Sequence, residues 1–453
     1  MHRTGRAPIT EPPAVTGSLI APSRPSSAWL RPAKALLLAG LALGMALFMS
    51  QLSAILVTNQ ANDVAAGSGR LREGGDSYLH WFALRALREG RNPYSPDVTQ
   101  ETQLAVWGRS LGPNVMAFVY PLPSLIWYLP MNWLDLATAS AYARLLGLAG
   151  LLLSLVLGLR LTGVPVRGWP LIAGAASLAS MGGVYDQQAL GQNASVALAL
   201  ALGAALLYRR GRYALAGLAL ALALAKPHHV LIVAAGLGLH ALWARARWGF
   251  FLGAGLGIGL PTAGSLLVSP GWVGQWLERL SRYSDYNFSY LQVTIGDAPL
   301  AIWLARVLVC LPVMAFWWWH RHDSASGDWF RLAVTGGLAA SMVALTANPS
   351  LYNVILVWPA LSLLLLTPMG ASRGFIDRLA RAVALAPTIL VPLSAGLIAL
   401  IWLLIRPGEG PSTLLLAQVA LVTVLVGLYQ GWTTTLWLLA RLIPTPGRTQ
   451  TVD

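Results

Sequence analysis

The chain has 453 residues, of which 56% are hydrophobic and only 11% are charged. Ordinary soluble domains have roughly 45–50% apolar and about 25% charged residues, so this composition excludes a soluble globular protein and predicts a polytopic membrane protein. The net charge of +14 comes almost wholly from arginines in short loops between apolar runs, a pattern that reports membrane orientation and excludes nucleic acid as a partner. We therefore expect an all-α membrane protein with one membrane domain.

The amino-terminal region predicts a tail followed by a first span. Residues 1–34 are rich in proline, serine and arginine and have too little apolar surface to fold alone, which is typical of a disordered cytoplasmic tail. The apolar run 35–57 is too long for a signal-peptide core and lacks a convincing cleavage site, so we expect it to remain as a transmembrane helix. The membrane domain then covers 35–443, and 444–453 form a cytoplasmic carboxy-terminal tail.

A charged stretch follows the first span, in the loop 58–136. Apolar residues recur at helical spacing over 77–89, with Gly90 after them, which predicts an amphipathic helix lying in the membrane interface. Asp76 directly precedes this helix. Later in the same loop, the proline-broken segment 118–134 is expected to dip into the membrane without crossing it, covered by protein or by a wet cavity.

Apolar windows along the chain predict about twelve membrane spans. Two of them are shorter than a bilayer requires and meet at 226–229, which predicts a tight hairpin or a broken helix there. The windows are 35–57, 137–160, 168–184, 190–208, 212–225, 228–243, 248–268, 299–319, 331–346, 351–367, 383–405 and 412–440.

Arginine-rich connections alternate with arginine-poor ones, which predicts the orientation of the bundle. We place the arginine-poor connections outside the cytoplasm. They are the two largest loops, 58–136 and 269–298, and the shorter connections 182–192, 226–229, 348–353 and 406–411. If 118–134 crossed the membrane, this pattern would be inverted. We find no internal repeat of the kind that paired-half transporters show.

Several short sequence elements occur in a characteristic order: Asp76 before a helix, "EGRNPY" at 89–94, "YPLP" at 120–123, "GQN" at 191–193 and "AKP" at 225–227. Their order and spacing resemble the GT-C membrane glycosyltransferases, and within these the chain is most similar to glycosyltransferase family 87, which includes polyprenol-phosphate-mannose-dependent mannosyltransferases. The resemblance covers about 35–365 and implies a GT-C-type helical bundle.

The resemblance also implies a reaction. A hexose, with mannose expected, would pass from a polyprenyl phosphate to a hydroxyl of a lipid or glycan acceptor at the outer face of a bacterial cytoplasmic membrane. Asp76 matches the family's catalytic base, and Lys226 matches a lysine near the donor phosphate. No cofactor or metal site is expected, and a divalent-ion requirement stays open. The other site residues that we expect are His228, His229 and Arg282 near the donor phosphate, and His80, Tyr94, Tyr120, Asp186, Gln192, Asn193, Tyr352 and Asn353 near the sugar or acceptor.

One departure from the family pattern bears on the acceptor. Relatives commonly carry a histidine in the turn before the tenth span, where this sequence has Tyr352 and Asn353. The difference leaves open an inactive relative that acts as an assembly partner. A transporter or flippase without glycosyl transfer is a further alternative.

Simpler structural roles also fit the candidate residues. Asp76 and Asn193 are good helix caps, and Lys226 at a helix end can extend to the interface. Asp186 fits an ordinary polar turn.

Overall fold

A computed structural model describes residues 75–179, 181–283, 289, 291–292, 298–346 and 351–366. The predictions for the tails and for the windows 35–57, 383–405 and 412–440 lie outside the described residues. Within those described, the regular elements are all helices, as the composition predicts.

The described helices follow the predicted apolar windows closely, because Arg, Pro and Gly residues interrupt the apolar runs. In chain order they are α2 (Gly75–Arg88), α3 (Pro96–Trp107), η1 (Leu122–Trp133), α4 (Leu136–Thr162), α5 (Gly168–Ala179), α6 (Gly182–Leu190), α7 (Ala194–Arg209), α8 (Tyr213–Ala223), α9 (Pro227–Leu242), η2 (Arg245–Arg247), α10 (Gly249–Val268), α11 (Trp272–Tyr283), α13 (Pro299–Trp319), α14 (Asp328–Leu345), η3 (Leu351–Val357) and α15 (Trp358–Leu366).

Several details differ from the prediction. The window 351–367 is divided between the 3₁₀ helix η3 and the α-helix α15. The window 168–184 is not one helix, because α5 ends at Ala179 and the backbone of Met181 is extended before α6 begins. The connection 182–192 is therefore mostly helical. Asp76 lies in the first turn of α2 instead of before it.

Three stretches are long and apolar enough to cross a membrane: α4, η2 with α10 (Arg245–Val268), and α13. Other apolar helices among the described residues are shorter, so the total of twelve spans stays a prediction, as does the interfacial position of α2. The long helices α10 and α13 expose large apolar side chains such as Leu252, Leu260, Leu308 and Leu311. In water such faces would be unfavourable, whereas a bilayer accommodates them.

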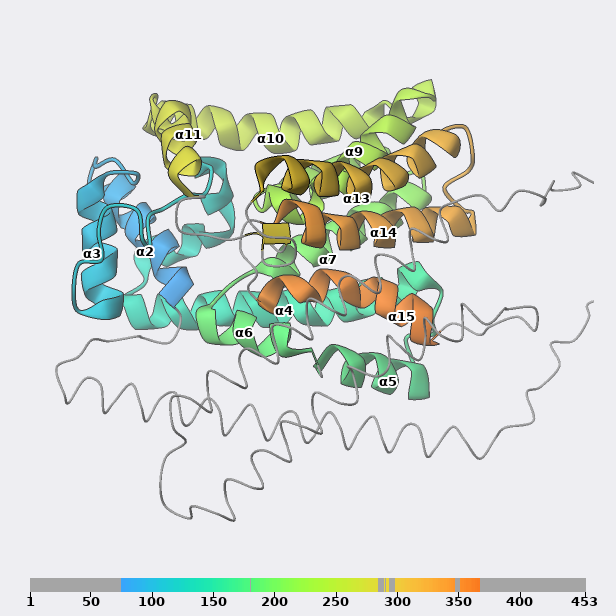
Figure 1. Cartoon of the computed structure of the whole chain (residues 1–453), viewed down its shortest axis with the longest axis horizontal. Helices are drawn as coiled ribbons and strands as arrows, with labels where there is room; N and C mark the ends of the chain where they lie inside the picture. The colour runs from blue at the N-terminus through green and yellow to red at the C-terminus, as the bar shows by residue number, and fades with distance from the viewer. Residues whose placement is uncertain are drawn as a thin grey trace, which may run out of the picture.

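The helices form an elongated bundle with a cap of shorter elements at one end. In Figure 1, α4, α10, α13 and α14 run in broadly the same direction, and α2, α3 and α11 lie together at the left end of the view. Hydrogen bonds tie the cap together: Trp276 Nε1 of α11 donates to the carbonyl oxygen of Val119 at 3.0 Å, and Trp81 Nε1 of α2 donates to that of Leu134 at 2.9 Å. The two largest predicted loops therefore meet in one cap.

The arginine-rich connections meet each other away from this cap. Arg209 donates to the carbonyl oxygen of Ser326 at 3.1 Å, and Arg247 donates to that of Arg321 at 3.1 Å. Arg331 donates to the carbonyl oxygen of Thr162 at 3.3 Å. The segregation follows the predicted alternation, although the side of the membrane that each end faces stays a prediction.

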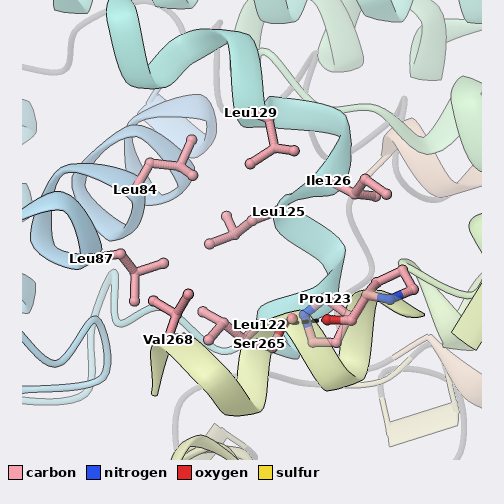
Figure 2. A pocket seen from close by; sticks show the side chains of 11 residues that line it. Leu84, Leu87, Leu122, Pro123, Leu125, Ile126, Leu129, Ser265 and Val268 are labelled. Carbon is pink, nitrogen blue, oxygen red and sulfur yellow. Dashed lines mark hydrogen bonds between the residues drawn. The ribbon is translucent and has the colours of Figure 1, made fainter. Parts of the chain in front are cut away.

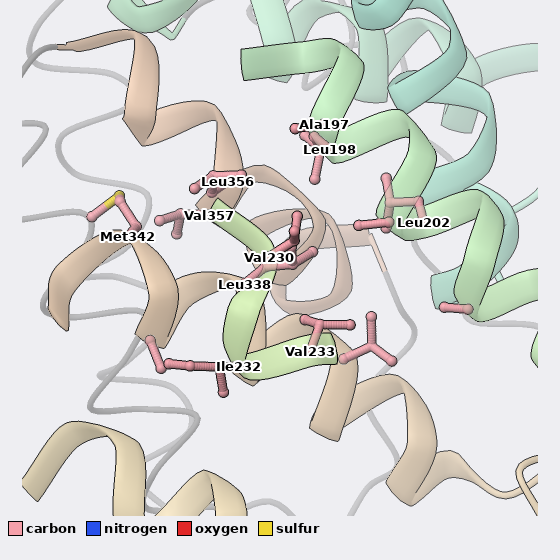
Figure 3. Packing of buried hydrophobic residues seen from close by; sticks show 14 of the residues in the cluster. Ala197, Leu198, Leu202, Val230, Ile232, Val233, Leu338, Met342, Leu356 and Val357 are labelled. Atoms are coloured by element: carbon pink, nitrogen blue, oxygen red, sulfur yellow. The ribbon is translucent and has the colours of Figure 1, made fainter. Parts of the chain in front are cut away.

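The main core lies between α7, α9, α14 and η3. Figure 3 shows Leu198 and Leu202 of α7 approaching Val230 of α9, with Leu338 of α14 and Leu356 of η3 completing the contact. Because these side chains are buried, they fix α9 against α7. The start of α9 carries Lys226, so this packing also sets the position of the lysine.

Candidate active site

The candidate site lies where α2, η1, the α6–α7 connection, the α8–α9 break and η3 converge. Asp76 Oδ2 accepts a hydrogen bond from Gln192 Nε2 at 2.6 Å. On the other side of the same amide, Lys226 Nζ donates to Gln192 Oε1. The structure thus brings the early carboxylate and the mid-chain ammonium together through one glutamine.

Local backbone geometry explains how Gln192 reaches this position. Gly191 ends α6 in the left-handed region, with φ 67°, a conformation that favours glycine. The backbone N–H of Gln192 then donates to the carbonyl oxygen of Gln187 at 2.9 Å, and Asn193 takes the N-cap position of α7. The "GQN" element is therefore a helix end, a bridging amide and a helix start.

A proline break positions Lys226 in the same way. The last helical residue of α8 is Ala223, Lys226 is the N-cap residue of α9, and Pro227 occupies the first helical position, where its missing N–H costs nothing. The structure thus interrupts the helix where the sequence predicts a tight hairpin or a broken helix. Lys226 is only 2% exposed and Gln192 only 3%, whereas Asp76 is half-buried.

Burial raises the pKa of the Asp76 carboxyl above its ordinary value of 3.8, while the Gln192 hydrogen bond and the Lys226 charge lower it. The net direction is upward, which makes the carboxylate a better proton acceptor than an exposed aspartate. One carboxylate oxygen, Oδ2, is used by Gln192.

Two tyrosine rings flank the ammonium of Lys226. Its Nζ lies 5.9 Å from the centroid of the Tyr120 ring and 5.2 Å from that of Tyr352. Such rings stabilise a cation in a site with little water. Tyr120 is itself held from the cap, because the Tyr94 hydroxyl donates to its carbonyl oxygen at 2.8 Å and Arg279 Nε donates to the carbonyl oxygen of Tyr94 at 2.8 Å.

His80 lies one turn beyond Asp76 on α2, in an aromatic enclosure. Its ring stacks on Tyr128 with centroids 3.8 Å apart, and Tyr120 and Phe118 contact it from other sides. Its Nδ1 lies 3.2 Å from the Asp76 carbonyl oxygen, which only accepts, so Nδ1 carries the proton. Burial, together with the nearby Lys226 charge, lowers the pKa of His80 to about 3. His80 is therefore neutral.

A histidine also lies beside the residues that depart from the family pattern. His229 Nε2 is 2.7 Å from Asn353 Oδ1, and both residues are buried. The ring of His228 stands edge-on to that of His229, with centroids 4.3 Å apart. A histidine of α9, His229, therefore lies next to the position where the sequence lacks the expected histidine.

The structure places the remaining candidate residues differently with respect to the site. Asn193 is fully buried, and its side chain lies next to the Tyr128 hydroxyl. Asp186 belongs to α6, and its side chain lies outside the described part of the structure. Arg282 is on an exposed face of α11, in an ion pair with Glu278 at 3.0 Å, and is not among the contacts that join the site.

Sequence reasoning missed Tyr128 as a site residue. This buried tyrosine stacks on His80 and lies close enough to Asp76 for the carboxylate charge to act on it. The available signal was a tyrosine within the apolar segment 118–134.

Two apolar cavities are lined by residues of the same elements that surround the polar site. The larger, about 310 Å³, lies between α2, η1 and α10, and Figure 2 shows Leu84 and Leu87 facing Leu125, Leu129 and Val268 across it. The second, about 220 Å³, lies between η1, α8 and α10, and its lining includes Pro121 and Ala225, which neighbour Tyr120 and Lys226 in the chain. Both cavities are lined by Pro123, Ile126 and Pro261, so they lie next to each other along η1 and α10.

In the described part of the chain, no group of three or more His, Cys, Asp or Glu side chains is arranged to hold a metal ion.

A family model described as "Glycosyltransferase family 87" matches residues 118–349, just over half of the chain. The match includes Gln192 and Lys226 but not Asp76. No curated protein and no solved structure shows significant similarity to the chain.

Proposed function

We propose, from the premise that the chain belongs to glycosyltransferase family 87 and is therefore an enzyme that transfers glycosyl groups, that its donor is a polyprenyl-phosphate hexose. Mannose is the hexose that we expect. The acceptor is a hydroxyl of a lipid or glycan, and the site opens on the outer face of the cytoplasmic membrane.

The observation that carries this proposal is the approach of Asp76 to Lys226 through Gln192. Glycosyl transfer from a phosphate needs a base for the acceptor hydroxyl and a positive charge for the departing phosphate. Here a half-buried carboxylate and a buried ammonium are separated by one amide, so the two chemical roles are held at neighbouring positions.

In the proposed step, the acceptor oxygen forms a bond to the anomeric carbon as the bond from that carbon to the phosphate oxygen breaks. The hydroxyl proton passes to the Asp76 carboxylate. The polyprenyl phosphate leaves with the electron pair of the broken bond, and its negative charge is stabilised by Lys226. One of the three N–H donors of Lys226 is used by Gln192, so the others are suited to phosphate oxygens.

The apolar cavities supply a place for the lipid chain of this donor. Their lining is mostly apolar, they adjoin the exposed apolar face of α10, and the lining of the second includes Ala225, the residue that precedes Lys226. An isoprenoid chain can therefore lie between η1 and α10 while its phosphate reaches the ammonium. Water-soluble nucleotide-sugar donors have no lipid chain that could occupy such an apolar surface.

The test is a transfer assay with the purified full chain in proteoliposomes. It uses radiolabelled polyprenyl-phosphate mannose or a nucleotide-linked mannose as donor, and membrane lipids as acceptor. We expect a labelled product with the lipid-linked donor alone. Absence of transfer from any lipid-linked hexose would overturn the proposal, and movement of the intact lipid-linked sugar between leaflets would instead indicate a flippase.

A further inference from the structure

The sequence suggests that Gln192 contacts the sugar or the acceptor, but in the structure its side chain lies between Asp76 and Lys226. A sugar contact needs polar atoms that are available to the sugar. Both polar atoms of this amide are already engaged, Nε2 with the Asp76 carboxylate and Oε1 with the Lys226 ammonium, and the side chain is buried.

The chemistry of the two neighbours fixes the amide's direction. An ionised carboxylate can only accept hydrogen bonds and an ammonium can only donate them, so Nε2 must face Asp76 and Oε1 must face Lys226. A neutral side chain that donates on one side and accepts on the other suits this place. Asparagine has the same amide on a shorter stem, and a carboxylate or an apolar side chain lacks one or both functions.

Without this spacer, Asp76 and Lys226 would be free to form a direct ion pair. Such a pair would occupy the carboxylate and the ammonium that the proposed reaction needs for the hydroxyl and the phosphate. The amide keeps them apart, leaves Asp76 Oδ1 for the acceptor hydroxyl, and uses one ammonium donor.

The backbone of Gln192 is anchored independently of the site. Gln187, one turn earlier, donates to the Ser195 hydroxyl at 2.8 Å and accepts from the Ser195 backbone N–H at 2.8 Å, while that hydroxyl donates to the Gly147 carbonyl oxygen at 2.7 Å. These bonds tie α6 to α7 and α4. The contacts that hold the backbone near Gln192 can therefore be changed without changing the hydrogen bonds of its side chain.

We infer that Gln192 is a positioning residue, which orients the Asp76 carboxylate for the acceptor hydroxyl and holds Lys226 at a distance from it. This inference rests on the proposed glycosyl transfer.

A pH profile distinguishes positioning from simple structural support. Among the described residues, the ionisable groups around Asp76 are Lys226 across the amide, His80 on its own helix, Tyr128 from η1, and Tyr142 of α4 beyond that tyrosine, with His228 and His229 beside Lys226. Of these, Gln192 bonds to Asp76 and Lys226. Leucine and glutamate are close to glutamine in size and still separate Asp76 from Lys226, but neither offers the amide donor. Losing this donor makes protonation of Asp76 easier, so activity must be lost at a higher pH.

The experiment compares transfer rates from pH 4 to 9 for the wild type, Gln192→Leu, Gln192→Glu and Gln187→Leu. Loss of a hydrogen bond to a charged group should move the acidic limb upward by about one to two pH units in both Gln192 variants. Gln187→Leu, which alters only the anchoring contacts, should lower the rate or the thermal stability without moving that limb.

Three outcomes separate the claims. An upward shift in both Gln192 variants supports positioning. A wild-type limb retained in folded Gln192→Leu and Gln192→Glu, whether the rate is unchanged or reduced equally at every pH, would overturn the inference while leaving the reaction intact. If the wild type itself transfers no sugar, the proposed function fails first.

Discussion

The half-buried carboxylate of Asp76 combines access with a raised pKa, which gives the first prediction. A base acts in its deprotonated form, so transfer should be present above the pKa of Asp76 and lost as the pH falls through it. Because burial raises this pKa above 3.8, the acidic limb of the rate should lie above that pH. The measurement is the rate of transfer against pH with saturating donor.

Asp97 offers a matched control for this profile. It is an exposed carboxylate in the first turn of α3, in the same cap. We expect Asp97→Asn to retain the wild-type profile and Asp76→Asn to lose activity at every pH. A wild-type rate that stays flat down to about pH 4, close to the ordinary aspartate value, would contradict the role of a raised carboxyl.

Lys226 gives the second prediction. Lys226→Met keeps an unbranched side chain but removes the charge, so transfer should fall by about 10²–10³-fold, as when a preorganised group that stabilises developing charge is lost. Arg282→Met should have little effect, because Arg282 is exposed and paired with Glu278. Equal losses in the two variants, measured as initial rates, would show that the buried lysine has no special relation to the donor.

Some residues of the candidate site could be predicted from the sequence. Family resemblance singled out Asp76, Gln192 and Lys226, and the structure brings these three together. The bridging position of Gln192 was not predictable, because it depends on a contact between residues 116 positions apart. The contact of His229 with Asn353 spans an even longer separation and shows the same limit.

At the scale of elements, the closest helix packing depends on glycines between α8 and α10. A Cβ at Gly253 would lie 1.8 Å from the carbonyl oxygen of Ala214, and one at Gly217 would lie 2.0 Å from that of Phe250. Backbone atoms cannot yield as a flexible side chain does. We therefore predict that Gly253→Ala destabilises the folded protein by about 1–3 kcal/mol, measured as resistance to denaturation in detergent.

Gly255 is the control on the same helix, since a Cβ there meets nothing within 4 Å. Gly255→Ala should be neutral or slightly stabilising, because alanine favours the helix. Equal stability of the two variants would mean that α8 and α10 do not pack as closely as described. Because α10 also lines both cavities, Gly253→Ala is expected to weaken use of the lipid-linked donor.

Helix boundaries were predictable where a charged residue or Pro interrupts an apolar run. The break between α5 and α6 was missed although Gly182 and Gly183 lie at it, because glycines also occur inside the apolar helices of this chain, as in α10. The segment 118–134 was correctly identified as irregular from its prolines. Its 3₁₀ geometry over Leu122–Trp133 was not predicted, because i→i+3 and i→i+4 bonding share similar apolar periodicities.

At the scale of the molecule, arginine-rich connections and the candidate site lie apart. From the positive-inside rule we predict that the arginine-rich end faces the cytoplasm and that the site faces the opposite side of the membrane. In a Cys310→Ser background, a membrane-impermeant thiol reagent should label Glu278→Cys on α11 in intact cells. It should label Ser326→Cys only after permeabilisation. The reverse pattern would put the site on the cytoplasmic face and exclude the proposed outward-facing reaction.

The central claim is that Asp76 accepts the proton while Lys226 stabilises the departing phosphate. The most direct measurement pairs donor binding with single-turnover transfer for the wild type, Asp76→Asn and Lys226→Met. We predict that Asp76→Asn binds polyprenyl-phosphate mannose normally but transfers it about 10²–10⁴-fold more slowly, whereas Lys226→Met loses both binding and transfer. Wild-type transfer by Asp76→Asn would contradict the account.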